Sequence, residues 1–93
     1  MTKETWSLVM SMLAKEIKMH ARTAKQARTI AREFAKRHGF SYLPGEPAYI
    51  YEPGDVRVIM ITTKPNGGIH MDLAYSPAYA LLGEFDIVMV DKI

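Results

Sequence analysis

A stripe of mostly apolar residues recurs at alternating steps of four and three along the first part of the chain. Its members are Trp6, Met10, Leu13, Ile17, His20, Ala24, Ala27, Ala31, Phe34 and His38. This spacing keeps side chains on one face of a helix. The segment 2–38 contains neither Gly nor Pro, Thr2 suits an N-cap, and Gly39 suits the position after a helix end. The pattern predicts one long helix over 2–38.

Such a helix is longer than the domain to which it belongs. At about 1.5 Å per residue it would span roughly 55 Å, whereas a compact chain of this length has a diameter of about 30 Å. The overhang would expose apolar residues, which monomers rarely tolerate. We therefore predict a homo-oligomer, most simply a two-fold dimer. The predicted interface consists of Trp6, Met10, Leu13 and Ile17, flanked by Leu8, Met12 and Met19. The alternative is a break between residues 20 and 23, which neither Gly nor Pro supports.

After Gly39 the hydrophobic period changes from about 3.6 residues to two, which indicates β-strands. Short strands are predicted at 40–43 and 48–52, and longer strands at 56–63, 69–75 and 85–91. The 87–90 run lacks alternation, which favours a central position for the last strand. Ser-Pro at 76–77 and Gly83 predict a short helix over 76–82.

The Asn66-Gly67 pair is a strong signal for a two-residue hairpin loop. That loop would pair Thr62 with Met71, Met60 with Leu73 and Val58 with Tyr75 on a core face. The opposite, outer face would then contain Ile59 and Ile61 together with His70 and Asp72.

These elements predict an α+β fold in a single domain, 1–93. A long basic amphipathic helix in 1–38 packs on a small antiparallel sheet of four to five strands in 39–93, with the short helix before the last strand. The sheet region is acidic. Nine Lys or Arg face three acids in 1–38, and three face seven acids in 39–93.

Composition narrows the class of protein. The apolar fraction of 48% and the charged fraction of 24% are typical of folded chains and argue against disorder. The absence of Cys excludes disulfides and thiolate metal sites, and it fits the cytoplasm. No segment approaches the roughly 18 consecutive apolar residues of a membrane span, and the start of the chain lacks signal-peptide features. We predict a cytoplasmic protein with no membrane partner.

A second stripe on the predicted helix is basic, and it consists of Lys18, Arg22, Lys25, Arg32 and Lys36, with Thr29 filling the gap. Like charges three or four residues apart repel by a few tenths of a kcal/mol each. An anionic partner relieves that repulsion, and phosphates are the commonest such partner. We therefore predict that these residues bind nucleic acid or another phosphorylated ligand. Two alternatives remain, a solvated face and a face that docks on a neighbour's acidic sheet.

His70 and Asp72 lie two apart on a predicted strand and near Thr63 across the hairpin. A His beside a carboxylate can act as a general base or bind a metal. Catalytic zinc sites usually take three protein ligands, and the other histidines lie on the helix stripe. Thr63, His70 and Asp72 are therefore a secondary candidate site for which a structural or interface role is favoured, and no metal or cofactor is predicted.

The chain contains no nucleophile elbow, Walker loop, dinucleotide fingerprint, paired zinc motif or EF-hand loop. The leading hypothesis is a non-enzymatic, oligomeric protein that binds nucleic acid or a phosphorylated ligand. The alternative is a protein-interaction module, a small inhibitor or adaptor, that acts through the outer sheet face or the N-terminal helix. An enzyme ranks third.

Overall fold

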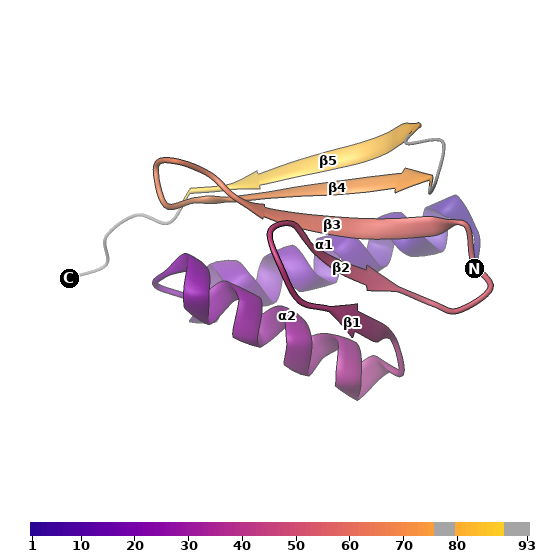
Figure 1. Cartoon of the computed structure of the whole chain (residues 1–93), viewed down its shortest axis with the longest axis horizontal. Helices are drawn as coiled ribbons and strands as arrows, with labels where there is room; N and C mark the ends of the chain where they lie inside the picture. The colour runs from indigo at the N-terminus through magenta and orange to yellow at the C-terminus, as the bar shows by residue number, and fades with distance from the viewer. Residues whose placement is uncertain (76–79, 89–93) are drawn as a thin grey trace.

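Two helices, rather than one, precede the sheet. The computed structural model describes residues 1–75 and 80–88 of the chain. In it α1 spans Lys3–His20, α2 spans Ala24–His38, and α2 runs back alongside α1 (Figure 1). Thr2 is the N-cap of α1, and Gly39 ends α2 with a φ of 77°, so both predicted caps are confirmed. Within the described residues, no helix is long and apolar enough to cross a membrane.

The chain leaves the helical conformation at residues 21–23. Thr23 Oγ1 accepts a hydrogen bond from the backbone N–H of Gln26 at 3.1 Å, and Gln26 Oε1 accepts one from the backbone N–H of Arg22 at 2.7 Å. This arrangement is related to the capping box, in which Thr and Gln three residues apart begin a helix without Gly or Pro. The prediction of one helix over 2–38 is therefore wrong, and the alternative of a break between residues 20 and 23 is confirmed.

The break also removes the predicted overhang. Trp6, Met10, Leu13 and Ile17 are at most 5% exposed and pack in the core of their own chain. The Cα radius of gyration is 12.4 Å, as expected for a compact chain of this length. These four side chains are core residues and do not form an exposed oligomer interface. The large apolar side chains left exposed along α1 are Leu8, Met12 and Met19.

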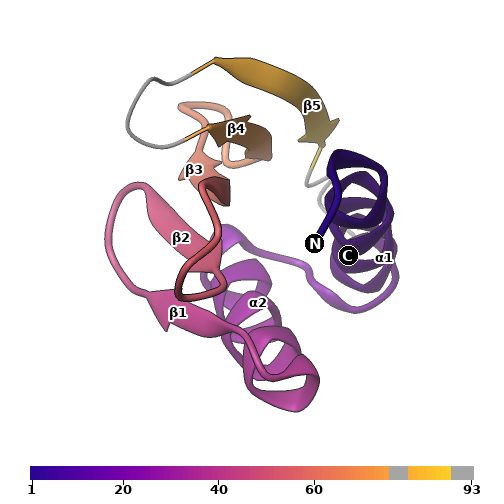
Figure 2. The same cartoon turned by 90° about the vertical axis from the view of Figure 1, so that its right-hand side faces the viewer.

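The sheet contains five antiparallel strands in the order β1-β2-β3-β4-β5. They are β1 (Ser41–Leu43), β2 (Ala48–Tyr51), β3 (Arg57–Thr63), β4 (Ile69–Tyr75) and β5 (Leu81–Ile87). The sheet curves around the helices, with α2 against β1 and β2 and α1 against β3, β4 and β5 (Figure 2). In the described part of the chain no element covers the other face. The α+β class and the antiparallel sheet are confirmed, with two helices ahead of the sheet.

The β3–β4 hairpin has a three-residue loop rather than a two-residue loop. The backbone N–H of Lys64 donates to the carbonyl of Gly68, and that of Gly67 donates to the carbonyl of Lys64, both at 2.9 Å. Gly67 has a φ of 83°, in the left-handed region that favours glycine. A β-turn followed by a left-handed residue and a bulge is the common form of the three-residue hairpin loop.

The extra loop residue shifts the pairing of β3 and β4 by one position. Ile61 lies opposite Met71 and Ile59 lies opposite Leu73, so the predicted pairing of Thr62 with Met71 is wrong. The equivalent predicted pairs at residues 58 and 60 are wrong for the same reason. A one-residue shift exchanges the two faces of a strand. Ile59 and Ile61 are therefore buried against the helices, and the outer face receives residues 58, 60 and 62.

Strand β5 begins where the sequence predicts the end of a short helix. Leu81 lies opposite Ala74 and Gly83 lies opposite Leu73. These residues are therefore paired with β4 as a strand and are not helical. The helix prediction is therefore wrong at 81–82, and its first part, 76–79, lies outside the described residues. The predicted central position of the last strand is also wrong, since β5 lies at the edge of the sheet formed by the described residues and Val88 is exposed. Residues 89–91 lie outside the described part.

Replacing Thr23 by alanine tests the helix break. We expect a loss of about 1 kcal/mol in the free energy of unfolding, because the backbone N–H of Gln26 loses its acceptor. Urea denaturation measures the loss. The matched control is Thr29→Ala, which removes an exposed hydroxyl from the middle of α2 and favours the helix. An equal loss in both variants would contradict the capping role.

Candidate functional site

The structure divides the predicted basic stripe between three places. Lys18 belongs to α1, and its Nζ lies 4.5 Å from the centroid of the Phe85 ring on β5. Arg22 lies in the connection between the helices. The remaining three residues, Lys25, Arg32 and Lys36, are exposed on α2. The five cations therefore do not follow one straight helix, and only the α2 members keep the predicted spacing.

Two cations of the predicted stripe, Lys25 and Arg32, line a groove between α2 and the connection from β1 to β2, here termed the α2 groove. Its volume is about 440 Å³. It is lined by Lys25, Arg28, Thr29, Arg32, Tyr42, Pro44 and Gly45. Three of these residues are cations and none is an acid. Cavities of roughly 300 to 1,000 Å³ commonly hold small ligands, so the α2 groove has space for a phosphorylated group.

Arg28 is the cation of the groove that is absent from the predicted basic stripe. Its Nη1 donates to Thr63 Oγ1 at 2.5 Å and lies 3.7 Å from Glu46 Oε2. Glu46 Oε1 in turn accepts a hydrogen bond from the backbone N–H of Thr63 at 2.6 Å. These contacts hold the guanidinium against the end of β3 while leaving its side chain 34% exposed. A sequence signal existed, because Lys25, Arg28 and Arg32 also follow steps of three and four.

Tyr42 contributes a half-buried aromatic side chain to the α2 groove from strand β1. Burial raises the pKa of its hydroxyl, although the positive charges of Arg28 and Arg32 act in the opposite direction. The phenol is therefore neutral at physiological pH and can donate a hydrogen bond. Arg32 also lies 3.7 Å from Glu33, but both side chains are more than half exposed, and such pairs contribute little.

The outer face of β4 and β5 contains the second predicted site in an altered form. His70 lies opposite Asp86 and Asp72 lies opposite Glu84. His70 Nδ1 donates to Asp86 Oδ1 at 2.8 Å, and His70 Nε2 lies 2.8 Å from Asp72 Oδ1. The hydrogen bond to Asp86 and the negative charge of Asp72 raise the pKa of His70. Thr63 does not join this cluster, because the shifted register turns it toward the helices and Arg28.

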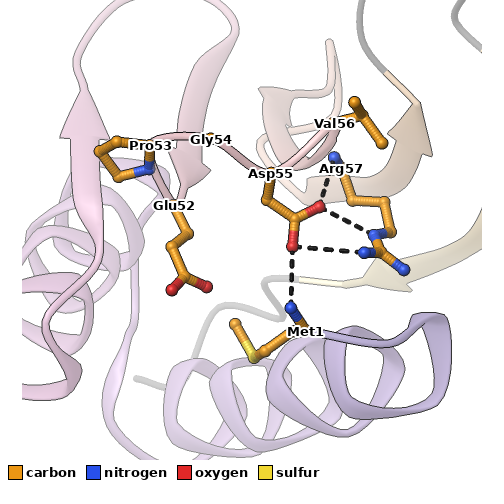
Figure 3. Close-up of a pocket in the computed structure, with 7 residues that line it drawn as sticks. All are labelled: Met1, Glu52, Pro53, Gly54, Asp55, Val56 and Arg57. Carbon is orange, nitrogen blue, oxygen red and sulfur yellow. Dashed lines mark hydrogen bonds and ion pairs between the residues drawn. The ribbon is translucent and has the colours of Figure 1, made fainter.

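A third polar group surrounds Asp55 in the turn between β2 and β3 (Figure 3). Its carboxylate accepts hydrogen bonds from Trp6 Nε1 at 3.0 Å and from the backbone N–H and Nε of Arg57 at 3.0 and 2.9 Å. Met1 N lies 3.1 Å away. The hydrogen bonds from Arg57 chiefly hold the pKa of Asp55 far below its ordinary value. Because its contacts join α1 to the turn, we assign this group a structural role.

The described residues thus provide a groove lined by cations, a His–carboxylate cluster and a structural carboxylate. Comparison with known protein families, with characterised proteins and with solved structures finds no match to this chain. Because one fold can host many functions, the role of each site is inferred from the chemistry of its residues.

Proposed function

We propose that the protein is a small, non-enzymatic binding protein that holds nucleic acid or another phosphorylated ligand in the α2 groove. The observation that carries this proposal is the meeting of Lys25, Arg28 and Arg32 in one groove of about 440 Å³ whose lining contains no acid. An arginine guanidinium matches a pair of phosphate oxygens with two parallel hydrogen bonds, and a lysine adds a mobile positive charge. Phosphate is therefore the group that best fits this lining.

The geometry of the groove also reduces the cost of ordering side chains. Arg28 is already held by Thr63 and Glu46, so it loses less rotational freedom when an anion binds. The ring of Tyr42 offers a surface on which a nucleic-acid base can stack. Lys36 continues the positive surface along α2, which favours an extended polyanion over an isolated phosphate.

A double variant, Lys25→Gln with Arg32→Gln, tests this function. We expect at least about a 10-fold loss of affinity at low salt, because two phosphate contacts disappear. For a single strand, the slope of log affinity against log salt should fall by about 1.4. Fluorescence anisotropy with a labelled single-stranded oligonucleotide, titrated across a series of salt concentrations, measures both quantities.

The matched control is Lys3→Gln with Lys15→Gln, which removes the same charge from exposed positions on α1 outside the groove lining. We expect a smaller loss and a slope close to that of the unchanged protein. Equal losses in the two double variants would mean that overall charge, and not the α2 groove, governs binding. Absence of binding by the unchanged protein at low salt would refute the nucleic-acid function, and competition by inorganic polyphosphate would identify phosphate as the recognised group.

Exposed apolar side chains along α1 favour protein interaction as a second candidate function. They are Leu8, Met12 and Met19, which are 61%, 42% and 62% exposed. Contiguous exposed apolar surface often marks a contact with another protein chain. Methionine is common at such contacts because its side chain adapts to different partners. A salt-insensitive oligomer that retains no nucleic acid, observed by size-exclusion chromatography with light scattering, would favour this function over the first.

A further inference from the structure

The His–carboxylate cluster on the outer face of β4 and β5 has a chemistry that the α2 groove does not use. We propose that His70, Asp72 and Glu84 bind one divalent transition-metal ion, with Zn²⁺ as the best fit. One ring nitrogen of His70 and one carboxylate oxygen from each of Asp72 and Glu84 all lie within 4.8 Å of one another. They come from the sheet face opposite the helices, so this site can exist whether or not the groove binds phosphate.

The distances between the three ligand atoms suit a common metal ion. His70 Nε2 lies 2.8 Å from an Asp72 oxygen and 3.8 Å from a Glu84 oxygen. Two ligands that are each about 2.1 Å from a tetrahedral Zn²⁺ lie roughly 3.4 Å apart. The two separations from His70 lie on either side of that value, and the carboxylate oxygens of Asp72 and Glu84 lie within 4.8 Å of each other. Binding would require the exposed side chain of Glu84 to rotate toward the other two ligands.

Strand pairing is what brings these residues together. His70 and Asp72 are two apart on β4, so they point to the same face. Glu84 on β5 lies directly opposite Asp72. Two carboxylates directly opposite each other in a sheet repel. A divalent cation bound beside His70 Nε2, which lies near both carboxylates, would offset this repulsion.

Asp86 gives the cluster a feature that a group of acids alone lacks. Its Oδ1 accepts the hydrogen bond of His70 Nδ1 at 2.8 Å, which leaves Nε2 directed at the other two carboxylates. Metal-binding histidines almost always donate their second ring N–H in this way, and the acceptor fixes the ring orientation. Asp86 is thus a positioning residue, and the three ligands are arranged around a nitrogen that is already oriented.

The ligand set also indicates which ion fits. One imidazole nitrogen with two carboxylates favours Zn²⁺, Mn²⁺ or Fe²⁺ over Mg²⁺ and Ca²⁺, which prefer oxygen ligands alone. Three protein ligands leave a fourth Zn²⁺ position for water or a ligand. The Asp72 side chain is 11% exposed, whereas that of Glu84 is 59% exposed. Glu84 is therefore the ligand that faces solvent, whereas Asp72 Oδ1 is buried, so entry of an ion requires movement of the Glu84 side chain.

The test is isothermal titration calorimetry of the full chain with ZnCl₂ at neutral pH, with MgCl₂ as the comparison ion. We expect one Zn²⁺ per chain and much weaker binding of Mg²⁺. His70→Gln and Glu84→Gln should each lower the Zn²⁺ affinity by at least about 10-fold, and Asp86→Asn should lower it by about 10-fold. Visible absorption of the Co²⁺ complex provides a second readout, because its intensity reports the coordination geometry.

Two variants at the other histidines, His20→Gln and His38→Gln, serve as controls and should retain one Zn²⁺ per chain. Circular dichroism identifies any variant that fails to fold. Glu84→Gln should disturb folding least, because the side chain of Glu84 is mostly in solvent. The proposal is overturned if the unchanged protein binds no Zn²⁺. It is equally overturned if a folded Glu84→Gln or His70→Gln variant binds Zn²⁺ as tightly as the unchanged protein.

Discussion

Replacing Ile61 by alanine should lower the free energy of unfolding by about 3 kcal/mol, whereas replacing its neighbour Met60 should lower it by less than about 1 kcal/mol. Ile61 is 1% exposed and lies in the core opposite Met71, so its truncation leaves a cavity beneath the helices. Met60 is only half-buried on the outer face, where water can fill the space that it leaves.

The comparison of these two variants tests the register of the β3–β4 hairpin. Urea denaturation provides the midpoint and the slope for each variant, and an unchanged slope shows that the difference is one of stability. A two-residue loop at Asn66-Gly67 would exchange the faces of β3, so that Met60 would be buried and Ile61 exposed. Equal losses, or a larger loss for Met60→Ala, would therefore contradict the three-residue loop.

Replacing Asp55 by asparagine should lower the free energy of unfolding by about 2 to 3 kcal/mol at neutral pH. The side chain is 5% exposed, and its carboxylate accepts hydrogen bonds from both Trp6 and Arg57. Asparagine has a similar shape but lacks the negative charge, and its NH₂ group cannot accept from these donors. The buried indole N–H or the guanidinium of Arg57 would then lose its partner.

The effect of this substitution should depend on pH. The pKa of folded Asp55 lies well below the ordinary value of 3.8, so the unfolded chain binds the proton first as the pH falls. The contribution of Asp55 to the free energy of unfolding is therefore complete above the ordinary pKa of 3.8. It is lost as the pH falls from there toward the lower pKa of the folded state. The difference between the unchanged protein and Asp55→Asn should shrink between about pH 5 and about pH 2.

Chemical denaturation at several pH values measures this difference. Glu52→Gln is the matched control, because it removes a carboxylate from the same turn. Figure 3 draws no hydrogen bond or ion pair between the side chain of Glu52 and the other labelled residues. We expect Glu52→Gln to change the free energy of unfolding by less than about 0.5 kcal/mol at each of these pH values. A difference for Asp55→Asn that stays constant as the pH falls would contradict the charged role of Asp55.

The helix break shows why a strong local pattern can mislead. The apolar stripe continues in step through residues 21–23 because both helices bury one face against the same core, from Trp6 on α1 to Phe34 on α2. Periodicity therefore reports which side chains are buried and not whether the helix is continuous. The Thr23 and Gln26 capping pair is visible in the sequence as the start of a second helix. It involves only two residues, whereas the apolar stripe that indicates one continuous helix involves ten.

Prediction of the candidate sites was limited in the same way. Lys25 and Arg32 were predicted from helical spacing, whereas Tyr42 entered the α2 groove only because β1 packs beside α2. The shared face of His70 and Asp72 followed from the period of a strand. Glu84 and Asp86 joined them through the pairing of β4 with β5, which depends on where β5 begins.

The sequence by itself determined the α+β class, the cap residues Thr2 and Gly39, and four of the five strands to within about one residue at each end. These features depend on side-chain period and on hydrogen bonds between residues close in the chain, both of which are local. Only the tertiary structure decided four features. They are the packing of α2 alongside α1 after the break, the register of β3, the edge position of β5 and the residues that make up each site. Those features depend on contacts between residues distant in sequence, where one extra loop residue is enough to exchange a buried face for an exposed one.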